Sequence, residues 1–185
     1  MDIAPSMAAL VLPGLTPENA LALIGEALTH RGYRPALSPL PDNYPREQDE
    51  WLAFATLPPP QEGLAIQVME DIDAVFRVAR WLAEQTAHLQ FAAVRRYMGG
   101  SPTVKFYSGG RALWRDGDDP DHELLYDLPS TPPSEAQPQL WGGQEASAAT
   151  AERLLERVPG PWKTLVSSDA PIGVSAWVQS QSPLG

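Results

Sequence analysis

The residues whose types could do chemistry most directly lie in one acidic loop, which reads Asp-Gly-Asp-Asp-Pro-Asp-His-Glu over residues 116–123. Carboxylates that alternate along a loop can supply the several oxygen ligands that Ca²⁺ and Mg²⁺ require. The spacing fits an EF-hand poorly, because Pro120 interrupts it and Asp127 stands at the twelfth position, where a glutamate is needed. A solvated turn, in which Asp and Gly serve backbone geometry, is the simpler interpretation. The candidate metal ligands are Asp116, Asp118, Asp119, Asp121 and His122.

Basic and aromatic residues interleave along 95–115, where Tyr97, Phe106 and Trp114 are among the aromatics. Aromatics beside cations on a sheet can bind single-stranded nucleic acid. The RNP pattern is absent, however, and a formal net charge of −10 opposes binding to a phosphate backbone. We therefore expect no nucleic-acid partner, and expect these strands to have one core face and one solvated face. The basic residues chosen as candidate contacts for a partner protein are Arg95, Arg96 and Arg111.

Trp141 is a further candidate for partner binding, because it stands alone in a Pro/Gly-rich segment. An aromatic in such a segment anchors it either to the body of the protein or to a partner. His30 and His88 stand where predicted helices end, and a favourable helix dipole is a sufficient structural reason for them. Neither belongs to a metal-binding or catalytic histidine pattern.

Motifs of common enzyme classes are absent from the sequence. The chain has no cysteine, which excludes disulfides, thiolate catalysis and zinc-thiolate sites. It has no G-x-S-x-G elbow, and its Gly-Gly pairs at 99–100 and 109–110 lack a Walker lysine and are typical of turns. We assign no catalytic residue and no cofactor. Whether the protein is an enzyme stays open, with a non-enzyme favoured.

Two helices and several strands must position these residues. Thr16 can cap a helix over 17–31, Pro17 suits its first turn, and Gly32 can end it. Apolar spacing predicts a second helix over 73–87. The predicted strands cover 7–12, 50–57, 64–69, 89–98, 103–107, 111–115, 122–128 and 172–179, and a third helix covers 147–158.

The order of these elements predicts an α+β fold, with an antiparallel sheet and both main helices on one face. Strand, helix, strand, strand, helix, strand is the ferredoxin-like βαββαβ order. Hairpins and the third helix would extend it toward the C-terminus. The same elements in another strand order are the alternative. We divide the chain into a core domain (1–128), a Pro/Gly-rich linker (129–146) and a helix-and-strand extension packed on the core (147–185).

Composition limits the function classes. With 185 residues, 23 acidic against 13 basic residues and no long apolar run, the chain is expected to be a soluble cytoplasmic protein without a signal peptide or membrane span. Its negative charge attracts basic partners. We therefore predict a macromolecular interaction module that binds or neutralises a partner protein, with a homodimer as a further possibility. The alternative is a metal-dependent or small-molecule-binding protein that uses the acidic loop at 116–123.

Overall fold

A computed structural model describes residues 3, 6–12, 15–35, 49–56, 64–68, 74–116 and 174–180. It shows two helices packed on an antiparallel sheet, so the α+β prediction is confirmed at this level. The helices are α1 (Pro17–His30) and α2 (Ala74–Gln85). The strands are β1 (Met7–Val11), β2 (Arg34–Pro35), β3 (Asp49–Thr56), β4 (Leu64–Val68), β5 (Phe91–Arg96), β6 (Thr103–Ser108), β7 (Arg111–Asp116) and β8 (Val174–Ser180).

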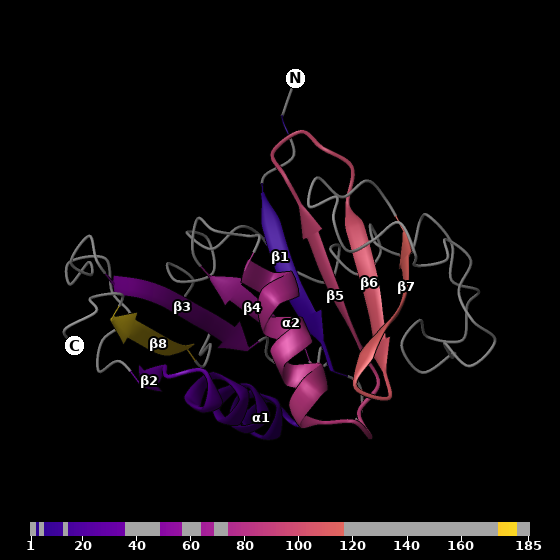
Figure 1. The fold of residues 1–185 in the computed structure, drawn as a ribbon. Helices are drawn as coiled ribbons and strands as arrows, with labels where there is room; N and C mark the ends of the chain where they lie inside the picture. Colours follow the sequence, from indigo (N-terminus) through magenta and orange to yellow (C-terminus); the bar gives the residue numbers. More distant parts are fainter. Residues whose placement is uncertain are drawn as a thin grey trace.

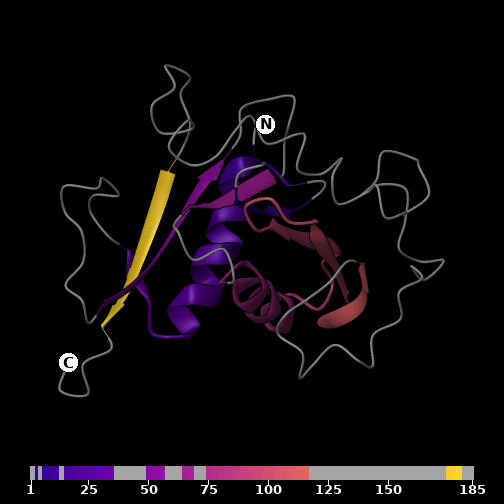
Figure 2. The ribbon, with the colours of Figure 1, turned by 90° about the horizontal axis from the view of Figure 1, so that it is seen from above.

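In the described residues the sheet has eight strands in the order β2-β8-β3-β4-β1-β5-β6-β7, and every neighbouring pair is antiparallel. It twists strongly, as sheets of L-residues do, so that β3 and β8 run across the direction of β5 and β6 (Figure 1). Seen from above, the strands curl around α1 and α2 (Figure 2). Both helices thereby share one face of the sheet.

Strand β2 is a structural feature that the sequence did not predict. Residues 34 and 35 pair with Val178 and Trp177 of β8, a segment far away in the chain. Pro35 is compatible with this place because β2 stands at the end of the strand order, where proline is tolerated. No local pattern could reveal a two-residue strand whose partner among the described residues is so distant.

Helix α1 begins and ends where its sequence predicts. The Thr16 hydroxyl accepts a hydrogen bond from the Asn19 amide, which satisfies one of the free N–H groups of the first turn. At the other end, the Gly32 amide donates to the Thr29 carbonyl and the Tyr33 amide donates to the Leu28 carbonyl. This is the Schellman arrangement, and it needs the positive φ of 87° that Gly32 adopts.

One hydrophobic core joins the helices to the sheet. Helix α2 contributes an almost continuous buried stripe, which includes Phe76, Trp81 and Leu82. Helix α1 contributes Ile24 and Leu28, both fully buried. The sheet side of the core comes from β1, β3, β5 and β6, with Leu10, Leu52, Phe54, Phe91, Ala93 and Tyr107, and Leu12 joins it just after β1.

The expected division of the central strands into one core face and one wet face is wrong. Every residue of β1 and all but the last of β5 and β6 are buried, so both faces of these strands are buried. Arg95 is 1% exposed and Lys105 is 9% exposed. Both share the helix-covered face with Ala93, and both lie over the ring of Phe76. Their alkyl stems pack as apolar groups do, which a pattern of residue types does not reveal.

Several predicted features lie outside the described residues: the strand at 122–128, the linker at 129–146 and the helix at 147–158. The division into domains therefore stays a prediction. The last predicted strand is present as β8 and pairs with β3 along seven residues, from Asp49↔Ser180 to Ala55↔Val174. In the part of the chain that is described, no helix has the length and apolar character needed to cross a membrane.

Candidate interaction groove between helix α1 and strand β8

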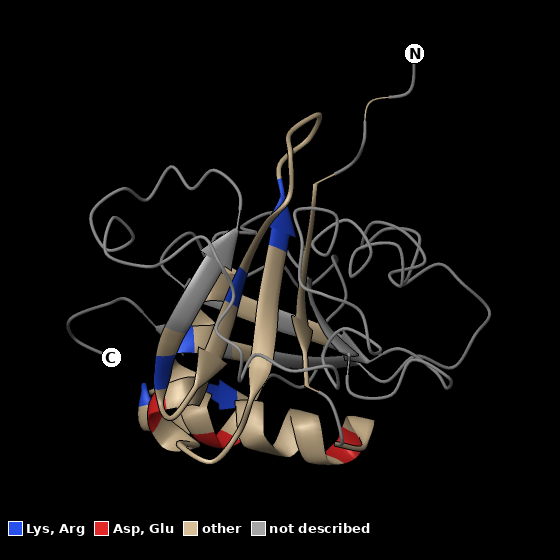
Figure 3. Cartoon of the chain, turned by 90° about the vertical axis from the view of Figure 1, so that its right-hand side faces the viewer, with Lys and Arg blue, Asp and Glu red and all other residues tan. Residues whose placement is uncertain are grey.

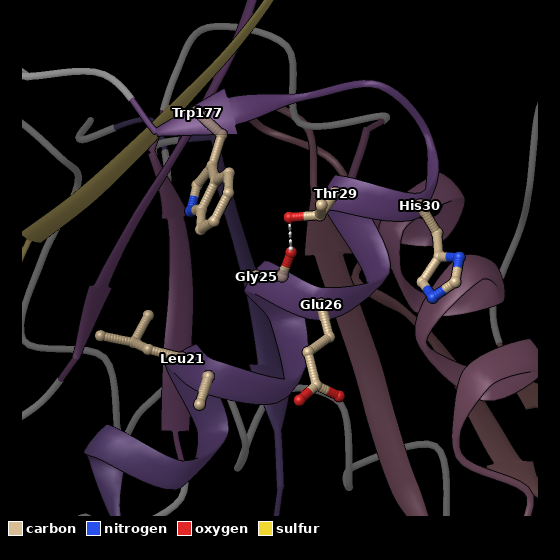
Figure 4. Close-up of a pocket in the computed structure, with 7 residues that line it drawn as sticks. Leu21, Gly25, Glu26, Thr29, His30 and Trp177 are labelled. Carbon is tan, nitrogen blue, oxygen red and sulfur yellow. Dashed lines mark hydrogen bonds between the residues drawn. The ribbon is translucent and has the colours of Figure 1, made fainter.

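An open groove of about 400 Å³ lies between the outer surface of α1 and the side chain of Trp177 on β8. Figure 4 shows the indole of Trp177 reaching toward the helix backbone at Gly25. The helix lines the groove with Leu21, Ala22, Gly25, Glu26, Thr29 and His30. The groove therefore lies between a helix near the start of the described chain and the strand at its end.

Gly25 makes the close approach of helix and indole possible. A Cβ atom at this position would lie 2.7 Å from Cζ2 and 3.0 Å from Cη2 of Trp177, well inside van der Waals contact. Glycine costs about 1 kcal/mol relative to alanine in a helix interior. Its presence in the middle of α1 is explained by the ring that lies against it.

Strand β8 is also held to the C-terminal end of α1. The side-chain amide of Gln179 donates to the Arg31 carbonyl at 2.6 Å, which satisfies one of the carbonyls that a helix end leaves open. Trp177, two residues earlier on the same face of β8, is half-buried and packs against the edge of the core. The wall of the groove is thus fixed by a hydrogen bond and by packing.

The chemistry of the groove is an apolar floor with a polar rim. Leu21, Ala22, Gly25 and the Trp177 ring form the apolar part. The Thr29 hydroxyl donates to the Gly25 carbonyl at 2.8 Å, so its proton is already used within the helix. Glu26 and His30 are exposed, and no ion pair of either is found among the described residues.

A second tryptophan in the described residues has cations stacked over its ring. Trp81 of α2 has the guanidinium groups of Arg31 and Arg77 over its ring, each 5.4 Å from the centroid. Arg31 also forms an ion pair with Glu84, which ties α1 to α2. Trp177 differs, because no cation of the described part of the chain lies over its ring.

The basic residues predicted to contact a partner are not brought together. The Arg95 guanidinium is buried, 4.6 Å from the Phe76 centroid and 5.1 Å from that of Tyr97. Arg96 follows on the opposite face of β5, half-buried, and donates to the sulfur of Met7 at 3.4 Å. Arg111 is exposed at the start of β7. Figure 3 shows basic residues along these strands and acidic residues on the helices.

The remaining predicted site residues are placed in part or not at all. Asp116 is the last residue of β7, while Asp118, Asp119, Asp121, His122 and Trp141 lie outside the described residues. No cluster of three or more metal-ligating side chains occurs in the ranges that are described. The metal site and the role of Trp141 therefore stay predictions.

A small apolar tip is the other exposed hydrophobic feature. Met98 and Tyr97 lie at the turn between β5 and β6, and Ile3 lies against Gly99 of the same turn. Met98 is 68% exposed and Ile3 is 67% exposed. Exposed hydrophobic side chains of this kind are common on protein surfaces, whereas the groove is a concave site. We therefore take the groove as the candidate site.

Gly25 is one feature of the sequence that points to this groove. An isolated glycine inside a strong helix pattern often marks a close packing contact, and Gly25 is such a residue. What it contacts could not be foreseen, since Trp177 appeared only in a weakly alternating segment. Comparison with family models, with curated proteins and with solved structures returns no match to this chain.

Proposed function

We propose that this protein is a non-enzymatic interaction module that binds a partner protein through the groove between α1 and β8. The observation that carries the proposal is the half-exposed Trp177 ring over the bare backbone of Gly25. Tryptophan is enriched among the residues that dominate protein–protein binding energy, where it lies in a well-packed pocket. Here the indole packs closely against Gly25 through Cζ2 and Cη2, and the half-buried ring keeps exposed surface for a partner.

The shape and polarity of the groove favour binding over catalysis. Active sites combine a concave pocket with several converging polar groups. This groove is open, and among the residues that the structure describes only Glu26 and His30 offer ionisable groups to it. A net charge of −10 on the whole chain favours a basic partner and a fast, salt-sensitive association.

The finer description of the fold is part of the same proposal. The four strands β3-β4-β1-β5, with α1 after β1 and α2 after β4, have the neighbour order of a ferredoxin-like unit. Strands β6 and β7 then extend one side, and β8 and β2 extend the other. In this description the interaction groove lies between α1 of the ferredoxin-like unit and β8 of the extension.

The test is capture of a partner from the native cell extract by the tagged full-length chain. Ala22 is exposed and lines the groove, so Ala22→Tyr fills it without touching the core. Gln85→Tyr, on the exposed side of α2, is the matched control. We expect one stoichiometric partner with the wild-type chain and with Gln85→Tyr, and its loss with Ala22→Tyr. No stoichiometric partner at low salt, or equal capture by all three chains, would contradict the proposal.

A further inference from the structure

We infer that the groove between α1 and β8 receives an arginine side chain of the partner, held between the Trp177 ring and the Glu26 carboxylate. This inference rests on the proposed function and names the chemistry that the groove recognises. Both groups line the same cavity, one from β8 and one from α1 (Figure 4).

The first argument is that both groups are open to a ligand. Glu26 is exposed on α1, and among the described residues no lysine or arginine pairs with it. Trp177 is half-buried, and within the same ranges no cation stacks on it. An indole face and a carboxylate both attract a cation, and partial removal from water strengthens both attractions.

The second argument is that the apolar part of the groove suits the stem of an arginine. Three methylene groups precede the guanidinium, and long basic side chains bury such stems along apolar surface while the charged end stays at a polar rim. Leu21, Ala22 and Gly25 supply that apolar surface. The rim beyond it carries Glu26 and the imidazole of His30.

The third argument comes from the same molecule. Trp81 of α2 already has two guanidinium groups over its ring, those of Arg31 and Arg77, so this protein already contains guanidinium–indole contacts. A planar guanidinium can stack on an indole and at the same time donate hydrogen bonds to a carboxylate. An ammonium group has neither the planar shape nor the fixed donor directions for both contacts. The occupant is therefore an arginine, and charge complementarity with an acidic chain points the same way.

The test is a titration of the ¹⁵N-labelled full-length protein with Nα-acetyl-arginine amide, followed through the indole N–H signal of Trp177. Nα-acetyl-citrulline amide is the matched probe, since it has nearly the same shape without the charge, and sodium chloride equalises the ionic strength. We expect a saturable shift of the Trp177 signal with the arginine compound. The citrulline compound should give little or none.

Variants of the groove make the test specific. Glu26→Gln should weaken arginine binding by about fivefold, the size of one exposed charge pair. Glu18→Gln removes an exposed carboxylate of the same helix that does not line the groove, and should leave binding unchanged. Equal shifts with both compounds, or equal affinity for wild type and Glu26→Gln, would overturn the inference.

The titration tests the arginine site and the capture experiment tests the proposed function, so either can fail without the other. A captured partner whose binding is lost in Ala22→Tyr but unchanged in Glu26→Gln would overturn the arginine assignment and leave the proposed function in place. Arginine binding that depends on Glu26, in a chain that captures no partner, would support the site and contradict the proposed function.

Discussion

At the scale of single residues, there are a few positions where one side chain determines the local geometry. Thr16 and Gly32 bound α1, and both are recognisable in the sequence because capping depends on neighbours three or four residues away. Gly25 is different, because the reason for it lies in Trp177. Arg95 is different too, since its burial depends on the ring of Phe76 in another element.

The pairing of Gly25 with Trp177 predicts a non-additive double mutant. Gly25→Ala alone places a Cβ where the indole now lies, so the ring must move and its burial falls, which offsets the gain of about 1 kcal/mol in helix propensity. In a Trp177→Leu background the clash is relieved and the propensity gain remains. We expect a coupling of about 1 kcal/mol or more between the two substitutions in urea unfolding. Additive effects would show that the ring does not lie on Gly25.

The Thr16 cap predicts a second measurable effect. Thr16→Ala removes the acceptor of the Asn19 amide and should lower the free energy of unfolding by about 1 kcal/mol. Thr16→Ser keeps a hydroxyl at the same place and should restore most of that loss. Unfolding in urea measures both variants, and an equal loss in serine and alanine variants would argue against capping.

At the scale of elements, local sequence patterns predict which helices and strands form, but not which strands pair when they lie far apart in the chain. The helices and most strands follow from apolar spacing and turn residues, and their observed ends differ from the predicted ones by two residues at most. The position of β8 between β2 and β3 could not be predicted, because its alternation is weak and its partners lie far away in the chain. The groove depends on that pairing, so the sequence alone could not locate it.

The contact between α1 and α2 gives a prediction at this scale. Trp81 is 9% exposed and packs near Tyr33, with 5.9 Å between ring centroids. Trp81→Ala should cost about 3–5 kcal/mol, the range for large aromatic truncations in cores. Glu84→Gln breaks an ion pair whose two side chains are 41% and 45% exposed, so it should cost less than about 1 kcal/mol. Comparable losses for the two variants would contradict the account in which aromatic packing contributes more than the ion pair to the contact between the helices.

At the scale of the whole molecule, the charge distribution bears on the choice between an interaction module and a metal-dependent protein. Glu18, Glu26 and Glu84 lie on the described helices, which also carry Arg77 and Arg80, while most of the other basic side chains lie on the described strands. The acidic loop predicted to bind metal lies outside the described side chains. The account of an interaction module therefore rests on the groove and on the net charge of −10, and it makes no use of a metal.

Divalent cations test the competing account. A ligand that binds only the folded state raises the melting temperature. We expect no rise with Ca²⁺, Mg²⁺ or Mn²⁺ beyond that caused by the same ionic strength of NaCl. A rise that disappears in the Asp118→Ala/Asp119→Ala double variant would instead favour the metal-dependent protein that the loop at 116–123 predicts.

The central claim is that a partner protein docks in the groove between α1 and β8. The most direct measurement places a photo-reactive amino acid at Ala22 and, in a parallel chain, at Gln85, and irradiates both in native extract. We predict one predominant covalent adduct at residue 22, at near-stoichiometric yield, and none of the same mass at residue 85. No adduct at residue 22, or the same set of adducts at both positions, would contradict the claim.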